Sequence, residues 1–105
     1  MTKYKFTGNL KDLIDKAERG TAADIDFIMG KLTIESTLAE TKFADFALGL
    51  VTTFEGLEQI KHYLFNGTLI QRNYASLYFN RLGEWKYVKE AYDKGLIDET
   101  QAFAR

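Results

Sequence analysis

The stretch TLIQRNYASLYFNRLG (residues 68–83) decides the fold of this 105-residue chain. Thr68 and Gln71 have the spacing of a capping box, in which each of two side chains accepts a hydrogen bond from the backbone of the other residue. Apolar residues then recur at the three- and four-residue spacing of a helix face, and Gly83 supplies a residue that readily ends a helix. The sequence therefore predicts one helix from Thr68 to Leu82.

Similar signals recur on both sides of this stretch. Residues that favour helix N-caps precede further apolar runs of helical spacing, at Asn9, Thr21, Thr37, Thr52 and Asp98. Thr52 and Glu55 repeat the capping-box spacing, and the apolar run before them extends to Val51. With no Pro in the chain, we predict about seven short helices in antiparallel hairpins, an all-α fold that forms a single domain over residues 1–105.

One segment shows a different pattern. Residues 31–37 (KLTIEST) alternate apolar with polar side chains, which is typical of a short strand. A single strand has no partner to pair with, so we interpret the segment as the end of a helix followed by a loop. The alternative is an α+β fold in which Leu32–Ile34 is a strand.

The composition excludes several classes of chemistry. The chain has no Cys and one His, which removes disulfides, thiolate metal sites and two-histidine mechanisms. Its 14 Lys and Arg against 15 Asp and Glu give a net charge of −1, which argues against a general nucleic-acid binder. No apolar run is long enough for a membrane span, and the N-terminus lacks the apolar region of a signal peptide. We expect a cytoplasmic protein without cofactor or metal.

Segments bounded by glycine suggest an internal repeat. Gly8–Gly20 and Gly83–Gly95 each place two glycines twelve residues apart, and Gly56–Gly67 is similar but one residue shorter. Helical hairpins that recur at a fixed period are the signature of a helical solenoid.

A resemblance to a known family accompanies this repeat. Residues 72–84 (RNYASLYFNRLGE), followed by Val88 and Tyr92, resemble the short form of a HEAT-type repeat. In that family an Arg and an Ala precede a Leu-Gly-x-Leu-Gly-Asp turn, and here Phe79-Asn80 stands in place of the first Leu-Gly. The resemblance covers about 30 residues well and about another 30, before Gly67, only loosely. It implies a short solenoid that serves as a binding scaffold. The alternative is an unrelated, irregular helical bundle.

Residues that could carry catalysis are few. His62 is the one side chain whose ordinary pKa lies near neutrality, but no acidic or hydroxyl partner stands at a usable local spacing. Three carboxylate pairs could in principle serve acid–base or metal chemistry, although helix caps and solvated faces explain them: Asp12/Asp15, Asp24/Asp26 and Asp98/Glu99. An enzyme with His62 as its acid–base group is therefore the second alternative.

The richest candidate surface lies in residues 61–94. This segment holds eight of the fifteen aromatic residues, and six basic residues against three acidic ones. The helix at 68–82 carries too many large apolar side chains to bury on one face, so some of them must meet a second helix layer or a partner. Tyr and Arg are enriched in interface hot spots, and the binding residues predicted on this helix are Arg72, Tyr74, Tyr78 and Arg81.

These features predict a non-catalytic protein-interaction module that presents this aromatic and Arg-bearing face to a protein partner or to a second copy, as a homodimer. The first alternative is a nucleic-acid accessory protein that uses the basic and aromatic segment 61–94. If Trp85 anchors the last hairpin, replacing it by Ala should cost about 3–5 kcal/mol, whereas a loss below about 1 kcal/mol would place it at the surface.

Overall fold

The computed structural model describes residues 8–104, with side chains from Leu10 onward. Over these residues the chain forms seven helices and no strand, which confirms the predicted all-α fold. The helices are α1 (Gly8–Arg19), α2 (Ala22–Met29), α3 (Leu38–Leu48), α4 (Phe54–Asn66), α5 (Leu69–Leu82), α6 (Trp85–Asp93) and α7 (Glu99–Phe103). None of these described helices is long and apolar enough to cross a membrane.

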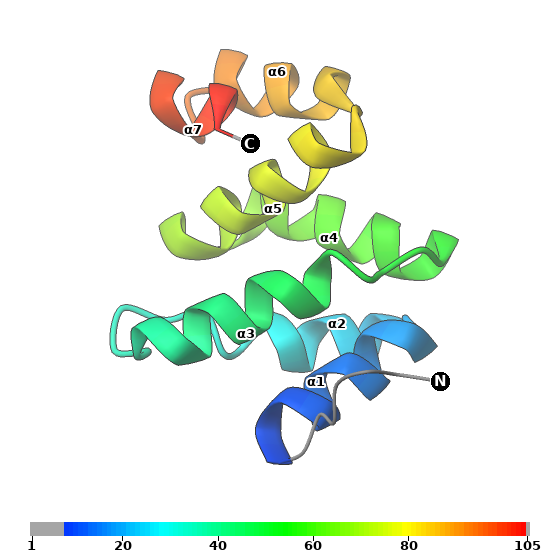
Figure 1. Cartoon of the computed structure of the whole chain (residues 1–105). Coiled ribbons are helices and arrows are strands. Elements are labelled where there is room, and N and C mark those ends of the chain that lie inside the picture. The colour runs from blue at the N-terminus through cyan, green and yellow to red at the C-terminus, as the bar shows by residue number, and fades with distance from the viewer. Residues whose placement is uncertain (1–7, 105) are drawn as a thin grey trace.

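The helices stack in order from α1 and α2 at one end of the molecule to α6 and α7 at the other (Figure 1). α1 packs on α3 and α5 packs on α7, while α2, α4 and α6 pack on one another in sequence. The contacts between α1 and α2, and between α4 and α5, join the two rows. This stacking suits a short solenoid as well as a bundle, so the HEAT-type repeat stays a prediction.

Local capping signals are borne out at four helix starts. Both halves of the capping box form at the helices α2, α3, α5 and α7, whose N-caps are Thr21, Thr37, Thr68 and Asp98. Each box satisfies backbone N–H groups that a helix start leaves without partners. The starts of these four helices are therefore determined by local sequence.

Three predicted helix ends are wrong by one to three residues. The helix α1 already includes Asn9, which is therefore not its N-cap. The N-cap of α4 is Thr53, not Thr52: the Thr53 hydroxyl accepts from Gly56 N. The same hydroxyl donates to the Gly20 carbonyl oxygen at 2.7 Å, a contact between distant parts of the chain. The helix α3 ends at Leu48, before the apolar run ends at Val51.

The segment after α2 is a loop. Turn hydrogen bonds join Lys31 to Ile28 and Leu32 to Met29. Leu32 is buried in the core, whereas Ile34 is 90% exposed. The interpretation of this segment as a helix end and loop is confirmed, and the strand at Leu32–Ile34 is not.

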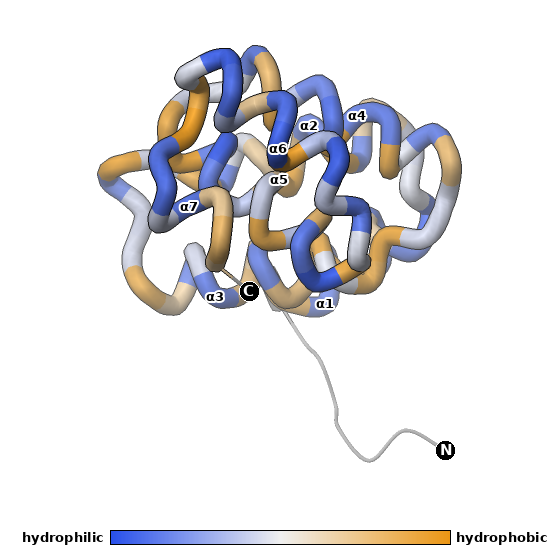
Figure 2. Tube along the Cα trace, turned by 90° about the horizontal axis from the view of Figure 1, so that it is seen from above, coloured by the Kyte–Doolittle hydropathy of each residue, from blue (hydrophilic) through white to orange (hydrophobic). Residues whose placement is uncertain are grey.

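The core runs between the two rows of helices. Apolar and polar residues alternate along the helical turns (Figure 2), and the apolar ones gather inside. The largest fully buried side chain is Phe79 of α5, whose ring makes edge contacts with Tyr78 and Tyr87. The helix α5 therefore lies at the centre of the packing.

Trp85, in contrast, is 57% exposed, so it does not anchor the last hairpin as a core residue. Trp85→Ala should lower the free energy of unfolding by about 1–2 kcal/mol, because less than half of the residue's surface is removed from water. Urea denaturation of wild type and variant measures this loss. A loss of about 3 kcal/mol or more would contradict the exposed position.

Candidate functional site

Three of the four predicted binding residues lie on one face of α5. Tyr74, Tyr78 and Arg81 stand at the spacing i, i+4 and i+7, which places them above one another on a helix. Arg72 lies roughly 160° around the helix from Tyr74, because each residue turns the helix by about 100°. The structure therefore brings three of these residues together and separates Arg72 from them.

Tyr78 points inward. Its side chain is only 6% exposed, and its hydroxyl donates to the Val51 carbonyl oxygen at 2.8 Å. Burial raises the pKa of Tyr78 above its usual value. The expectation that Tyr78 is presented at the surface is therefore wrong: the ring holds the segment after α3 against α5.

Arg81 is paired within the chain. Its Nη1 donates to both carboxylate oxygens of Asp45, at 3.0 Å each, across 36 residues of sequence. The side chains remain 47% and 24% exposed respectively, so the pair contributes at most about 1 kcal/mol to stability. Its main effect is to fix the guanidinium at the surface between α3 and α5.

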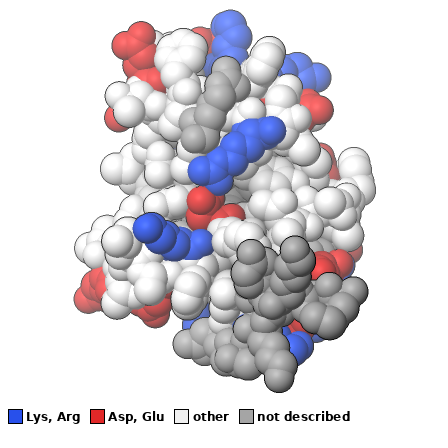
Figure 3. All heavy atoms as spheres, viewed as in Figure 1, with Lys and Arg blue, Asp and Glu red and all other residues white. Residues whose placement is uncertain are grey.

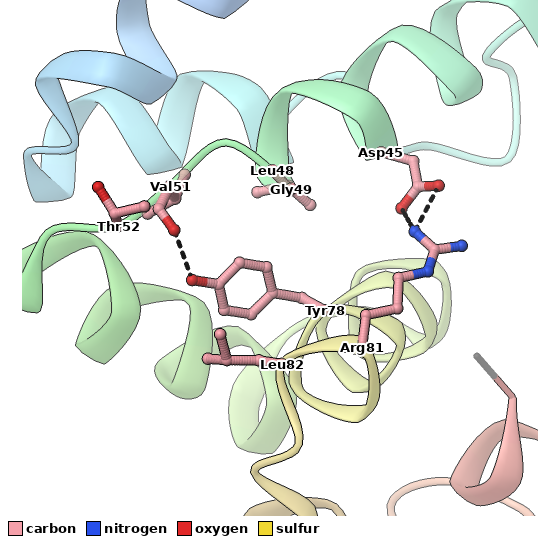
Figure 4. Close-up of a pocket in the computed structure, with 8 residues that line it drawn as sticks. All are labelled: Asp45, Leu48, Gly49, Val51, Thr52, Tyr78, Arg81 and Leu82. Carbon is pink, nitrogen blue, oxygen red and sulfur yellow. Dashed lines mark hydrogen bonds and ion pairs between the residues drawn. The ribbon is translucent and has the colours of Figure 1, made fainter.

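These side chains border a shallow groove (Figure 4). One part is a cavity of about 170 Å³, lined by Asp45, Leu48, Gly49, Val51, Thr52, Tyr78, Arg81 and Leu82. A neighbouring hollow of about 370 Å³ shares Asp45, Gly49 and Arg81 and adds Lys42, Phe46 and Leu50. We call the two together the α3–α5 groove.

The groove combines one ion pair with apolar walls. Tyr78 and Arg81 reach it from α5, while Asp45 reaches it from α3 (Figure 4). On the face that carries both helices, acidic and basic side chains lie together near the centre, among mainly uncharged ones (Figure 3). Such an arrangement offers hydrogen bonding at a fixed point and apolar contact around it.

Tyr74 belongs to the same electrostatic cluster. Its burial, then the negative charge of Asp45, raise its pKa above the usual value, while the positive charge of Arg81 acts in the opposite direction. In Asp45→Asn we therefore expect the pKa of Tyr74 to fall, because the anion that opposes ionisation is gone and Arg81 remains. Titration of the tyrosine Cζ signals by NMR measures the change.

The matched control is Asp93→Asn, which removes an ion-paired carboxylate on α6. It should leave the pKa of Tyr74 where it is in the wild type. An unchanged pKa in Asp45→Asn would mean that Tyr74 and Asp45 do not interact in solution.

Arg72 has a different environment. It is partly buried, and its Nε has no hydrogen-bond partner among the described residues. Because it lies away from Tyr74 and Arg81 on α5, it does not contribute to the α3–α5 groove.

Among the residues predicted as catalytic candidates, His62 and members of each carboxylate pair form hydrogen bonds, ion pairs or helix caps within the chain. His62 is exposed on α4, and its Nδ1 lies 3.3 Å from the Asn66 amide nitrogen. Asp12 and Asp15 pair with lysines on α1. Of the other two predicted pairs, Asp24 and Asp98 serve capping boxes, and Asp26 accepts hydrogen bonds from Gln59 and Tyr63. Within residues 8–104 no cluster of three or more acidic or His side chains is suited to hold a metal ion.

The α3 half of the groove escaped the sequence prediction. Asp45 lies on α3, and Gly49 and Leu50 lie in the segment that follows it. The sequence of this region gave no sign of a site, and no spacing in a single sequence relates Asp45 to Arg81. The one available signal was an acidic residue, Asp45, between the apolar Ala44 and Phe46 on α3, and it does not point to α5.

The chain matches no known family model, no curated protein and no solved structure.

Proposed function

We propose that the protein is a non-catalytic interaction module whose α3–α5 groove binds a protein partner or a second copy of the chain. The observation that carries this proposal is the Arg81–Asp45 ion pair, held at a fixed point among apolar side chains. Leu82, on the groove wall, is 50% exposed. Arginine beside apolar surface is the combination found at interface hot spots.

The groove is organised before a partner arrives. Tyr78 is held by Val51, and Arg81 is held by Asp45, so binding would immobilise few additional side chains. Lower ordering cost leaves more of the contact energy for affinity.

The chemistry of the groove defines the partner segment. Arginine has five N–H donors. Asp45 engages Nη1, and no residue in the described part of the chain accepts a hydrogen bond from Nη2 or Nε, which we propose for a partner. An apolar side chain placed against Leu82, next to a carboxylate or a backbone carbonyl, would match both features. We therefore propose an acidic and apolar segment as the partner.

Site-specific photo-crosslinking in the host cells tests the proposal. A benzophenone amino acid replaces Leu82 in the groove, and in a second variant it replaces the exposed Glu58 of α4, in the other row of helices. We expect one discrete protein adduct from position 82 and not from position 58. An adduct at twice the mass of the 12.0 kDa chain would identify a second copy.

Charge reversal supplies the matched control. Arg81→Glu, combined with the crosslinker at position 82, should remove the adduct because the carboxylate would repel both Asp45 and an acidic partner. Lys89→Glu reverses another exposed, ion-paired cation and should leave the adduct intact. No adduct at position 82, or the same adducts at 82 and 58, would refute the proposal.

A second candidate function comes from the other row of helices. Lys61 of α4 and Lys86 of α6 lie over the same ring, that of Tyr87, at 4.2 and 5.4 Å from its centre. Lys94 lies over Phe65 at 5.4 Å. This α4–α6 cluster of cations would suit phosphate groups, and it is the surface on which the nucleic-acid alternative depends.

Salt dependence separates the two candidates. A fluorescein-labelled single-stranded DNA should lose affinity steeply between about 50 and 200 mM salt if phosphates meet these lysines. Lys61→Ala should weaken that binding, whereas Lys11→Ala on α1 should not. Absence of binding at the lower salt concentration would exclude the second candidate. A cytoplasmic location is part of both proposals, and fractionation of the host cells tests it.

A further inference from the structure

A second hollow lies at the α6 and α7 end of the molecule, apart from the α3–α5 groove. It has a volume of about 490 Å³, within the range of small-molecule sites. We call it the α6–α7 pocket, lined by Asn80, Trp85, Val88, Tyr92, Ala102 and Phe103, with Lys89 and Asp93 at its rim.

Its walls are mainly aromatic. Trp85, Val88 and Tyr92 follow the i, i+3, i+7 spacing and so share one face of α6. Phe103 reaches the pocket from α7. Three aromatic side chains around one hollow favour a planar ring, which gains from stacked or edge-on contact beyond its area burial.

Asn80 contributes a defined polar atom. The residue is 4% exposed, and its Nδ2 donates to the carbonyl oxygens of Ala102 and Ala104, at 2.9 and 2.7 Å. This fixes the amide orientation, because a side-chain oxygen would repel both carbonyls. Asn80 Oδ1 has no hydrogen bond to the described residues, and Asn80 lines the pocket. Oδ1 is therefore an acceptor that Asn80 can offer to the pocket.

The charges at the rim neutralise each other. Lys89 Nζ lies 2.7 Å from Asp93, one helical turn away on α6. An anionic ligand would find Lys89 already paired with Asp93, and a cationic ligand would find Asp93 already paired with Lys89. The rim therefore favours an uncharged occupant.

From this combination we infer that the α6–α7 pocket binds a small, uncharged aromatic molecule that carries an N–H or O–H donor. The ring lies among Trp85, Tyr92 and Phe103, and the donor bonds to Asn80 Oδ1. The inference shares no residue with the α3–α5 groove, so either proposal can fail without the other.

Indole is a suitable probe, and NMR of the ¹⁵N-labelled protein is the readout. The chain has one Trp, so Trp85 gives a single indole N–H signal. Indole should shift this signal and the side-chain amide signals of Asn80, with a saturable dependence on its concentration. Shifts that stay linear up to the solubility limit, or that spread over the whole protein, would overturn the inference.

Two further ligands test whether the N–H donor contributes to binding and whether the occupant is a small molecule or a side chain of a partner protein. 1-Methylindole keeps the ring but lacks the N–H donor, so it should bind about fivefold more weakly. Equal affinity would refute the role of Asn80 Oδ1. N-Acetyltryptophanamide carries the same ring as a protein side chain, and if it binds more tightly than indole, the occupant is a partner's tryptophan rather than a small molecule.

Variants locate the binding. Tyr92→Ser should weaken indole binding at least about fivefold, because it removes one aromatic wall. Phe54→Ser removes an exposed aromatic side chain at the start of α4 and should leave the affinity unchanged. Dispersed spectra of both variants show that they are folded. Unchanged affinity in Tyr92→Ser would exclude the pocket as the site.

Discussion

Phe79→Ala should lower the free energy of unfolding by about 3–5 kcal/mol, the largest loss that we expect from a single substitution in this chain. The ring is fully buried at the centre of the core. Its centroid lies 5.2 Å from that of Tyr78 and 5.4 Å from that of Tyr87, both in edge-on geometry, so it joins α5 to α6. Its removal would leave a cavity that Tyr78 and Tyr87 cannot close without giving up their own positions.

Urea denaturation followed by circular dichroism measures the loss. Phe54→Ala is the matched control, since Phe54 is 79% exposed and should change stability by no more than about 0.5 kcal/mol. Domains of this size are stable by only about 5–15 kcal/mol, so Phe79→Ala could already be partly unfolded without denaturant. A loss below about 2 kcal/mol would show that the core repacks around the missing ring.

Gly20→Ala should cost about 2–4 kcal/mol, although the change adds only one methyl group. Gly20 has a φ of +63°, a left-handed conformation that costs other residues roughly 1–2 kcal/mol. A Cβ there would also collide with the side chain of Thr53, coming within 2.8 Å of its Cγ2. The Thr53 hydroxyl accepts from Gly56 N as the cap of α4 and donates to the Gly20 carbonyl oxygen. Displacing the Thr53 side chain would break the N-cap hydrogen bond of α4, which contributes about 1 kcal/mol.

Gly83→Ala separates the two causes. Gly83 has a φ of +86°, but a Cβ there would meet no atom of the described residues within 4 Å, so this variant carries the backbone strain without the collision. Thermal and urea melts of both variants should therefore give a larger loss for Gly20→Ala. Equal losses would mean that Thr53 moves aside without cost and that the Gly20–Thr53 contact does not stabilise the start of α4.

The local features of this fold could be predicted from the sequence. Four N-caps were placed correctly because a capping box is formed by residues three apart, within one turn of helix. Gly83, which is left-handed and follows α5, also stands where the sequence predicts a helix end. Helix count and fold class follow from such signals, because each depends on neighbouring residues alone.

The site could be predicted only in part. The sequence indicated α5 as a helix with more aromatic side chains than one face can bury, and the structure packs α4, α6 and α7 around it. It could not say which side chains point inward: Tyr78 is buried against Val51, and Trp85 is largely exposed. Both have the size and apolar character of core residues, so composition does not separate them.

What the sequence by itself determined is therefore the set of helices, and what only the tertiary structure decided is which faces of them meet. Asp45 and Arg81 are 36 residues apart, and Thr53 and Gly20 are 33 apart. Hydrogen bonds within a helix are formed between residues four apart, so they leave a signal in a short stretch of sequence. Contacts between helices depend on how whole elements pack. This packing places Asp45 of α3 beside Arg81 of α5, where the two side chains line the α3–α5 groove.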